Sequence, residues 1–501
     1  MIEGEDRAVA DWLGARAEKV IETSCARIFL TGDTAFKVKR PVDYGYLDFS
    51  TLERRRWALE RELAFNRDQA PDIYRAVRRV TRGPGGLAFD GAGEVVEYAL
   101  EMRRFDDRAV LAAQPQAIDA VLAERLGRTI ADFHIAAPLR PGGGGARALG
   151  YAVASNAEQL RGVAHLLGEA PVGRLVAAVQ AELDKVGPLL DARAAGGFAR
   201  RCHGDLHLGN ILLEAGRPVL FDCIEFNDLL CEIDVQYDLA FILMDLDFRG
   251  RRDAAARLLA AYLDQAARHF TDGLVEGLQA LPLMLAVRAG VRAHVSARGG
   301  ETAQARAYAA AALAHIAPPP PRLLAIGGRS GSGKSTLARL IAPRLGASPG
   351  ALVLRTDEIR KQLFGAAPGE RLPPDAYAAA PYAQVYDALF AAAMRALRAG
   401  RAVILDATFL DPELRARAEG AAREAGAPFE GFWLEAPADR LRARIEARAG
   451  DVSDATVATL ESQLVREPGT MDWTILDASG PPEALARRWP ATEGPGRAVF
   501  P

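Results

Sequence analysis

Residues 328–335 read Gly-Arg-Ser-Gly-Ser-Gly-Lys-Ser, a complete G-x-x-x-x-G-K-[ST] phosphate-binding loop. A short apolar run at 322–327 precedes the loop, and from residue 334 onward the leucines recur at helical spacing. This order of strand, loop and helix indicates a parallel sheet covered by helices, with the bound phosphate at the helix N-terminus. The loop therefore restricts both the ligand class and the fold class of this part of the chain.

The residue types of the loop assign a role to each position. Glycines let backbone N–H groups turn toward the phosphates, the lysine reaches the β and γ oxygens, and the final hydroxyl binds Mg²⁺. We expect the cofactors to be ATP or GTP together with Mg²⁺. The residues expected to hold the nucleotide are Gly328, Ser330, Gly331, Ser332, Gly333, Lys334, Ser335 and Thr336. Ser335 is also expected to be a metal ligand.

Four consecutive prolines at 318–321 mark the sharpest boundary in the sequence, because a polyproline run is a semi-rigid spacer. With 501 residues, the chain is long enough for two or three domains. We expect a first domain at 1–316, a linker at 317–321 and a second domain at 322–501.

Beyond the prolines, strand-like runs alternate with helical segments. The strand-like runs lie at 322–327, 351–356, 402–406, 430–435 and 474–478. Such alternation is typical of an α/β fold, in which a parallel sheet has helices on both faces. The second domain is therefore predicted to be a P-loop NTPase with a parallel sheet and flanking helices.

The first domain has an α+β pattern. Its strand-like runs lie at 27–30, 35–39, 73–79 and 95–100. One helix is expected among them, opening with a capping box at Ser50 and Glu53 and reaching about Asp68. From residue 107 the pattern becomes mainly helical. We predict a small β-rich lobe at about 1–103, a helical lobe at about 104–316, and a cleft between them.

A second constellation of polar residues lies in the first domain. Residues 203–210 read His-Gly-Asp-Leu-His-Leu-Gly-Asn, and residues 219–226 read Val-Leu-Phe-Asp-Cys-Ile-Glu-Phe. Asp205 and Asn210 are five apart on one loop, and Asp222 ends an apolar strand. This order suits phosphoryl transfer, because Asp205 can accept the proton of an acceptor hydroxyl while Asn210 and Asp222 hold Mg²⁺.

The H-G-D-x-x-x-x-N segment resembles the motif of the aminoglycoside phosphotransferase family, whose members are relatives of the protein kinases. The resemblance covers roughly residues 20–300. It implies a bilobal protein-kinase-like fold, an ATP cleft, two Mg²⁺ ions and transfer to a hydroxyl. The chain has no G-x-G-x-x-G loop, so the resemblance leaves open how the first domain covers the phosphates.

That family pairs a lysine on a strand with a glutamate on a helix. Here the strand offers Lys37 and Lys39 on one face, and the helix offers Glu60 and Glu62. The resemblance therefore implies that these side chains contact the nucleotide phosphates or orient the lysine that does. We favour Lys37 with Glu62 as the ion pair.

Polar residues at the strand ends of the second domain predict a kinase. Asp357 follows the second strand and can take a proton from an acceptor hydroxyl, and Arg360 can hold an acceptor anion. Asp406 ends the third strand and resembles the Walker-B carboxylate that binds Mg²⁺. Thr408, two residues later, is a further candidate for acceptor contact.

A row of arginines follows, at Arg440, Arg442, Arg444 and Arg448. Arginines four apart share a helix face, and on a mobile segment they can close over the transferring phosphoryl group. The whole order resembles small P-loop kinases of the polynucleotide-5′-kinase, zeta-toxin and gluconate-kinase group, over about 322–480. This resemblance implies a base at Asp357 and a lid arginine at Arg444 or Arg448.

Charge and hydropathy restrict the partners. The net charge is −3, and residues 322–501 carry 23 Lys or Arg against 22 Asp or Glu. A long nucleic acid would require a more basic surface, so a small hydroxyl-bearing molecule or the 5′ end of a short oligonucleotide fits better. The acidic N-terminus is unlike a signal peptide, and the longest apolar stretch is too short to span a membrane. We therefore expect a cytoplasmic protein with reduced cysteines.

Three functions agree with these patterns. The first is a bifunctional phosphotransferase with two ATP-dependent heads. The second is one catalytic head with the other binding nucleotide as a regulator. The third is a toxin-type or nucleic-acid-end-modifying P-loop protein. The sequence names neither acceptor and leaves the oligomeric state open.

Overall fold

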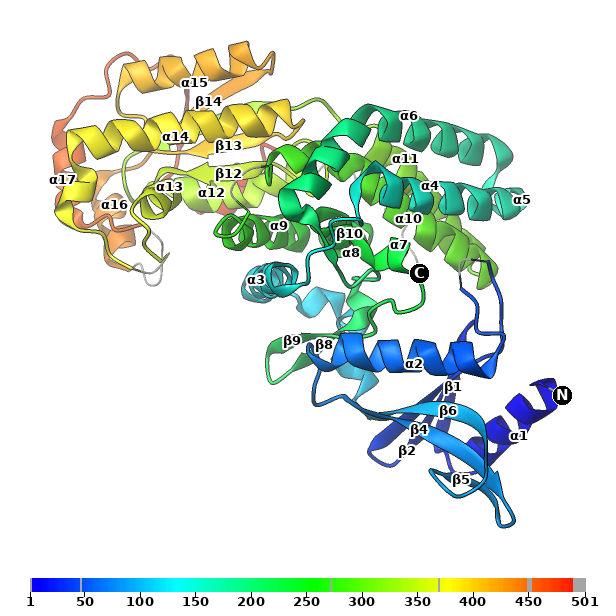
Figure 1. The fold of residues 1–501 in the computed structure, drawn as a ribbon. Helices are drawn as coiled ribbons and strands as arrows, with labels where there is room; N and C mark the ends of the chain where they lie inside the picture. Colours follow the sequence, from blue (N-terminus) through cyan, green and yellow to red (C-terminus); the bar gives the residue numbers. More distant parts are fainter. Residues whose placement is uncertain (1, 46, 271–272, 368–369, 448–452, 490–501) are drawn as a thin grey trace.

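The computed structural model describes residues 2–45, 47–270, 273–367, 370–447 and 453–489. Figure 1 shows two folded parts: one runs from the N-terminus through the helices drawn in green, and the other contains the yellow and orange elements. The proline run between them, 318–321, has no regular secondary structure. Within the described residues, no helix combines the length and apolar character needed to cross a membrane.

The small lobe is built on one antiparallel sheet in the order β1-β2-β3-β6-β4-β5. Its strands are β1 (Lys19–Glu22), β2 (Ala26–Thr31), β3 (Thr34–Lys39), β4 (Tyr74–Gly83), β5 (Gly86–Phe89) and β6 (Glu94–Arg103). Successive side chains of a strand point to opposite faces. In β2, accordingly, Phe29 packs with helix α1 (Ile2–Gly14), whereas Leu30 packs with helix α2 (Leu52–Arg67).

The expected capping box at the start of α2 is wrong by one residue. Thr51, not Ser50, is the N-cap, and its hydroxyl accepts a hydrogen bond from Arg54 N at 3.3 Å. The Ser50 hydroxyl instead donates to Asp48 Oδ1 at 2.6 Å. A local acceptor two residues earlier therefore takes the serine out of the cap. Helix α1 was not predicted at all.

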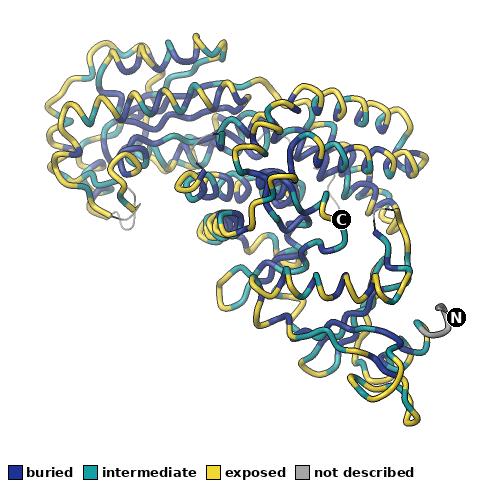
Figure 2. Tube along the Cα trace, in the orientation of Figure 1, coloured by how far each residue is buried: buried dark blue, intermediate teal, exposed yellow. Residues whose placement is uncertain are grey.

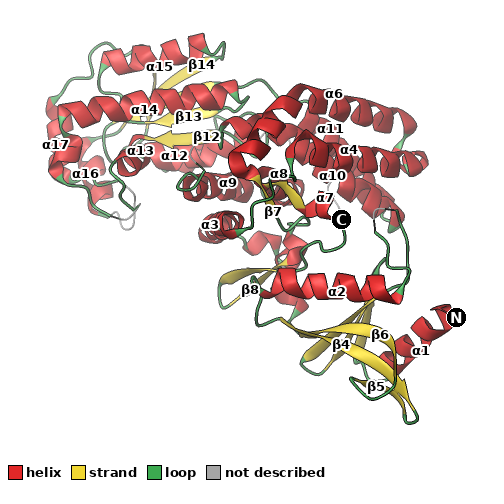
Figure 3. Ribbon diagram, viewed as in Figure 1, coloured by secondary structure: helices red, strands yellow, loops and turns green. Residues whose placement is uncertain are grey.

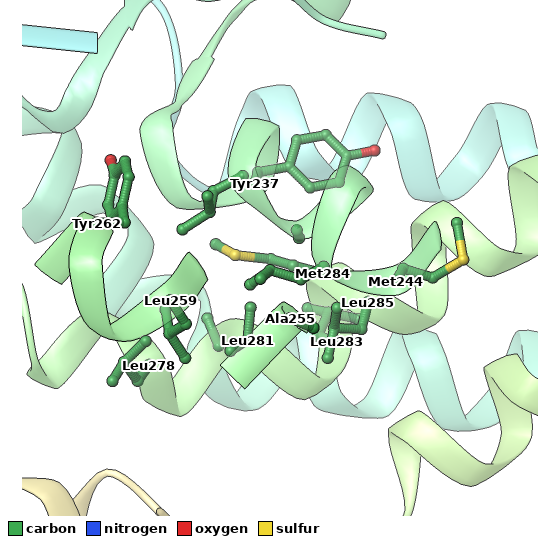
Figure 4. Close-up of a cluster of buried hydrophobic side chains, with 14 of the residues drawn as sticks. Tyr237, Met244, Ala255, Leu259, Tyr262, Leu278, Leu281, Leu283, Met284 and Leu285 are labelled. Carbon is green, nitrogen blue, oxygen red and sulfur yellow. The ribbon is translucent and has the colours of Figure 1, made fainter. Parts of the chain in front are cut away.

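The helical lobe surrounds α8 (Val235–Phe248), which is buried over most of its length. Its other helices are α3 (Ala120–Ala136), α4 (Gly145–Gly162), α5 (Ala164–Leu167), α6 (Glu169–Arg193), α7 (Asp228–Cys231), α9 (Arg252–Ala266), α10 (Leu281–Arg298) and α11 (Thr302–Ile316). Figure 4 shows the core, where Met244, Leu259 and Met284 lie among other apolar side chains. This apolar block provides the rigid support on which the first polar constellation lies.

Two short strand pairs complete this lobe. Strand β7 (Ala199–Arg201) pairs with β10 (Glu232–Asp234), and β8 (Ile211–Glu214) pairs with β9 (Arg217–Leu220), both antiparallel. The loop that carries residues 203–210 runs from β7 to β8, so strand pairing fixes both of its ends. The prediction of an α+β, bilobal protein-kinase-like fold is confirmed.

The second part is a five-stranded parallel sheet in the order β12-β13-β11-β14-β15. The strands are β11 (Leu323–Gly328), β12 (Leu352–Arg355), β13 (Val403–Asp406), β14 (Phe429–Glu435) and β15 (Thr474–Asp477). All five predicted strands are present, and Figure 3 shows helices packed around them. The prediction of a P-loop fold with a parallel sheet is confirmed.

Seven helices of this part are described. They are α12 (Lys334–Ile341), α13 (Thr356–Leu363), α14 (Ala379–Arg398), α15 (Pro412–Glu424), α16 (Ala438–Glu446), α17 (Val457–Val465) and α18 (Pro482–Ala486). Alternate residues of β11 serve the two faces of the sheet: Leu323 packs in the cluster with α14, and Leu324 packs in the cluster with α12. Figure 2 shows buried segments along this sheet and along the central helices of the helical lobe.

The two folded parts are docked together. Helix α9 packs against β12, and its Arg252 donates to Gly346 O at 2.8 Å and to Pro349 O at 3.2 Å. Nearby, the Ser348 hydroxyl donates to Asp247 Oδ2 at 2.5 Å. Because Arg252 bonds to backbone carbonyls across the interface, it fixes both the distance and the orientation between the two folded parts.

The Arg252 contacts predict a measurable docking energy. Arg252→Ala should lower the free energy of unfolding by about 3 kcal/mol or more, because it removes two hydrogen bonds from a charged donor, each worth roughly 1.5–3 kcal/mol. Urea denaturation followed by tryptophan fluorescence measures this. Arg174→Ala, on the exposed surface of α6, is the matched control. Equal unfolding midpoints for the two variants would contradict the docking role.

Candidate active sites

A buried carboxylate fixes the loop that carries Asp205. Asp238, at the start of α8, accepts hydrogen bonds from His203 N at 3.0 Å and Gly204 N at 2.8 Å. Burial alone would raise the pKa of Asp238, but His134 and His203 outweigh it and the pKa lies below its usual range. A buried anion that receives two backbone N–H groups holds the loop in one conformation.

Asp238 also belongs to the one buried group with metal-ligand spacing among the described residues, together with His134 and Cys202. Each member already has a hydrogen-bond partner. His134 lies 3.1 Å from Asp238 and 2.9 Å from the Tyr262 hydroxyl, and the Cys202 thiol donates to the Ile233 carbonyl. The group is therefore an anchor for the loop and not a metal site.

Asp205, Asn210 and His207 form the polar end of this loop. Asn210 Nδ2 donates to Asp205 Oδ2 at 3.0 Å, and His207 Nε2 lies 3.5 Å from the same oxygen. Burial alone would raise the pKa of Asp205, but His207 and then His203 hold it below its usual range. Conversely, burial would lower the pKa of His207, and Asp205 raises it overall. The sequence did not predict the contact of His207 with Asp205, although His207 lies inside the motif.

The two candidate lysines share one glutamate. Lys37 Nζ lies 2.7 Å from Glu62 Oε1, and Lys39 Nζ lies 2.7 Å from Glu62 Oε2. Lys37 also pairs with Asp222 at 2.6 Å, and Lys39 with Glu225 at 2.6 Å. The favoured Lys37–Glu62 pair is present, but it is part of a chain of five alternating charges.

The remaining candidate, Glu60, lies on the exposed side of α2 and pairs with Arg56 at 2.8 Å. Burial alone would lower the pKa of Lys37, but Asp222 and Glu62 raise it well above its usual value. Lys37 is therefore charged at neutral pH.

The oxygen atoms of this site suit Mg²⁺. Asp222 has a left-handed backbone with φ of 64°, and its N–H donates to the Tyr74 hydroxyl at 3.0 Å. Asn210 uses its amide nitrogen for Asp205, which leaves its carbonyl oxygen for a cation. A carboxylate and an amide oxygen are ligands that Mg²⁺ prefers. The residues present therefore fit a nucleotide-bound metal.

The second site begins with the glycines of the phosphate loop. Gly328, Gly331 and Gly333 have φ of 141°, 80° and 90°. At Gly331 a Cβ would lie 2.6 Å from Leu441 O, so no larger residue fits there. Ser330 N donates to Gln463 Oε1 at 2.8 Å, which ties the loop to α17.

An arginine missed by the sequence interpretation gathers the candidate metal ligands. Arg355, the last residue of β12, donates to Ser335 Oγ and to Asp406 Oδ2, both at 3.1 Å. Its third nitrogen donates to Glu358 Oε1 at 3.0 Å. Ser335 and Asp406 therefore face the same guanidinium group, and a hydroxyl beside a carboxylate suits Mg²⁺.

A cavity of about 710 Å³ opens beside the loop. Its lining includes the predicted residues Ser330, Gly331, Gly333, Lys334, Ser335, Thr336, Asp357, Arg360, Asp406, Thr408 and Arg444. It also includes Tyr377, Tyr382 and Asp454, together with Tyr386, which the sequence interpretation did not single out. Most candidate residues of the second domain thus meet around one space large enough for a nucleotide and an acceptor.

Arg360 and Arg444 keep donor groups available in this region. Arg360 is 5% exposed; one nitrogen donates to Ala376 O at 2.9 Å, and its Nε has no hydrogen-bond partner among the described residues. Arg444 donates to Gly480 O at 3.0 Å, and its Nη1 is likewise unpartnered in that part of the chain. Arg442 points elsewhere and pairs with Glu461, while Arg448 lies outside the described residues.

Comparison with known proteins divides the chain in the same way. Residues 51–274 match the family described as "Phosphotransferase enzyme family", and residues 323–467 match "AAA domain". The fold and the matches define a protein with a phosphotransferase-family domain followed by a P-loop kinase-like domain.

Relatives that match over most of the chain come from mycobacteria. "Uncharacterized protein Rv2004c" of Mycobacterium tuberculosis and "Uncharacterized protein Mb2027c" of Mycobacterium bovis are each 32% identical over 484 residues, which is 93% of either chain. The chain belongs to the family of these mycobacterial proteins.

Solved structures resemble the parts separately. The Mycobacterium tuberculosis APS kinase CysC in complex with AMPPNP and APS is 24% identical, with 34% of this chain and 95% of that chain covered and a TM-score of 0.26. A Sinorhizobium meliloti gluconokinase is 22% identical, with 35% and 93% covered and a TM-score of 0.24. A Plasmodium vivax ethanolamine kinase is 10% identical, with 59% and 81% covered and a TM-score of 0.36.

The His207–Asp205 contact predicts a pH-dependent contribution to stability. The pKa of His207 is raised above its usual value of 6.5, so its stabilisation is complete below that pH and lost as pH rises through the folded value. The pKa of Asp205 is lowered, so that carboxylate stays ionised throughout the neutral range. The unfolding free energy of the wild type minus that of His207→Asn should therefore be larger at pH 6 than at pH 9. A difference that is constant or grows with pH would contradict the contact.

Proposed function

We propose that the chain is a bifunctional ATP-dependent phosphotransferase, in which each domain transfers the γ-phosphoryl group of ATP to a hydroxyl. The acceptors would be small molecules or the end of a short oligonucleotide. The observation that carries this proposal is the same grouping in both sites: a carboxylate for the acceptor hydroxyl, two oxygen ligands for a metal, and a cation for the phosphates. ATP dependence and free thiols support a cytoplasmic location.

In the first head, Asp205 would receive the acceptor hydroxyl. Its lowered pKa keeps it ionised, so it would orient the hydroxyl and take its proton as the new bond forms. Lys37, held by Glu62, would contact the nucleotide phosphates, and Lys39 would keep Glu62 in place. Asn210 and Asp222 would hold Mg²⁺, which neutralises phosphate charge when bound.

In the second head, the phosphate loop would hold the nucleotide, with Lys334 on its outer phosphates. Asp357 would accept the proton of the acceptor hydroxyl. Ser335 and Asp406 would hold Mg²⁺. Arg444, whose Nη1 is unpartnered among the described residues, would stabilise charge on the transferring group, and we extend this lid role to Arg448.

Arg360 supports an acidic acceptor for this head. A buried guanidinium group is expensive unless it pairs with an anion. Within the described residues no carboxylate lies within ion-pair distance of Arg360, and its Nε is unpartnered. A carboxylate, sulfate or phosphate on the acceptor would complete the pairing, and Thr408 would contact the same molecule.

Head-specific variants test the bifunctional proposal. Asp205→Asn should lower the acceptor-stimulated ATPase activity of the first head by about 10²- to 10⁴-fold, as for the loss of a positioned base. Lys334→Ala should remove the activity of the second head, because this lysine would bind the outer phosphates of the nucleotide. Each change should spare the other head. The measurement is ATP consumption with a panel of nucleosides, sugars, antibiotics and 5′-OH oligonucleotides. Glu60→Gln, at an exposed position of α2, is the control. Loss of both activities from either single change would favour one catalytic and one regulatory head instead.

The buried Arg360 side chain gives a separate prediction. Arg360→Gln should raise KM for an acidic acceptor of the second head by about 10- to 100-fold, as expected for a charged hydrogen bond of roughly 1.5–3 kcal/mol. The kcat should change little, and Arg360→Lys should recover part of the loss. If neutral and acidic acceptors responded equally, the assignment of Arg360 to an acceptor anion would be wrong.

A further inference from the structure

A second cavity, of about 730 Å³, lies between the two folded parts. One wall comes from α3, α9 and the turn after α9, and the other from β12, α13 and the segment that follows α13. Figure 1 shows α9 and α3 beside the end of the second part where α12 and α13 lie. Its volume matches that of the nucleotide cavity and falls within the usual range of small-molecule sites, which often form at domain interfaces.

Hydrogen bonds join the two walls of this cavity at two places. On one side, Arg252 of α9 donates to Gly346 O and Pro349 O of the second part. On the other side, Gln362 of α13 donates to Asp264 Oδ1 of α9 at 3.2 Å. Hydrogen bonds between the two folded parts therefore flank this cavity.

The cavity lining carries more basic than acidic side chains, although two of the basic ones, Arg355 and Lys361, also pair with Asp406 and Asp454 outside it. Its basic residues are Arg128, Arg257, Arg268, Arg339, Arg355 and Lys361, and its acidic residues are Glu124, Asp264, Glu358 and Glu370. Two of the acids are each shared by two arginines. Glu124 lies 3.9 Å from Arg128 and 3.6 Å from Arg257, and Glu358 lies 3.0 Å from Arg355 and 3.9 Å from Arg339. The wall formed by α3, α9 and the turn after α9 contributes Arg128, Arg257 and Arg268 against Glu124 and Asp264, so this wall favours a ligand with negative charges.

Arg355 connects this cavity with the phosphate-loop site. It lines the interdomain cavity, whereas Ser335 and Asp406, to which it donates, line the nucleotide cavity. Its remaining nitrogen holds Glu358 in the interdomain cavity. An anion near Arg339 and Glu358 would draw the guanidinium group toward itself and weaken its bonds to Ser335 and Asp406. Those two oxygens would then be better ligands for Mg²⁺.

We propose that the interdomain cavity binds a small metabolite with two or more acid groups, and that this polyanion strengthens Mg²⁺ binding at the phosphate loop through Arg355. The binding site itself is independent of the proposed phosphotransfer. Its regulatory effect rests on the proposed function of the P-loop head. Arg355 acts as a positioning residue, because it touches the metal ligands and not the reacting atoms.

The first experiment tests the site. Isothermal titration of citrate and of fructose 1,6-bisphosphate into full-length Lys334→Ala should show saturable binding, since this variant removes phosphate binding at the loop. Adding Arg257→Ala and Arg268→Ala should weaken that binding at least tenfold. Arg174→Ala, outside the cavity, should leave it unchanged. Absence of binding by both probes, or equal binding with and without the two cavity substitutions, would overturn the site.

The second experiment tests the connection. Binding of a fluorescent ATP analogue is measured against free Mg²⁺, and the component missing in Lys334→Ala is assigned to the phosphate loop. A saturating polyanion should lower the half-saturating free Mg²⁺ by about fivefold or more, which is the usual lower range of coupling between sites. In Arg355→Lys the polyanion should still bind without moving this value. An unchanged value in the wild type would overturn the coupling, whatever the phosphotransfer assays show.

Discussion

Glu62 has no exposed surface, and its two carboxylate oxygens each bind the ammonium group of a lysine. A buried charge must be paired. The two lysines are in turn paired with further carboxylates, Lys39 with Glu225 and Lys37 with Asp222. In the second domain the central buried charge is a cation. The Arg355 guanidinium group donates hydrogen bonds to two carboxylates and a hydroxyl. In both domains, the pairing of one buried charge positions the candidate site residues around it.

The sequence was sufficient for features that depend on neighbouring residues. The phosphate loop, all five parallel strands and the Asp205–Asn210 loop follow from local spacing, because glycine conformation, apolar runs and turn geometry act over a few residues. The prediction of Ser50 as the N-cap of α2 was wrong, because Asp48 accepts the hydrogen bond of the Ser50 hydroxyl. Local sequence patterns therefore predict a cap correctly only where no second hydrogen-bond acceptor lies close to the capping side chain.

Features that depend on distant residues could not be predicted. Glu225 meets Lys39 across 186 positions of the chain, and nothing near Glu225 indicates a lysine partner. Nothing in the residues around Arg355 indicates its partner Asp406, which the pairing of β12 with β13 places beside it. Arg444 and Arg442 share a short helix, yet one lines the cavity and the other pairs with Glu461. Which arginine serves the site depends on how α16 packs, which spacing alone does not determine.

The row of alternating charges from Glu225 to Asp222 passes between the lobes of the first domain. Lys37, Lys39 and Glu62 belong to the small lobe, while Asp222 and Glu225 belong to the segment after β9 in the helical lobe. The lobes cannot separate without leaving ammonium and carboxylate groups unpaired. The placement of the small lobe and the position of the Asp222 carboxylate, a candidate metal ligand, are therefore linked through Lys37.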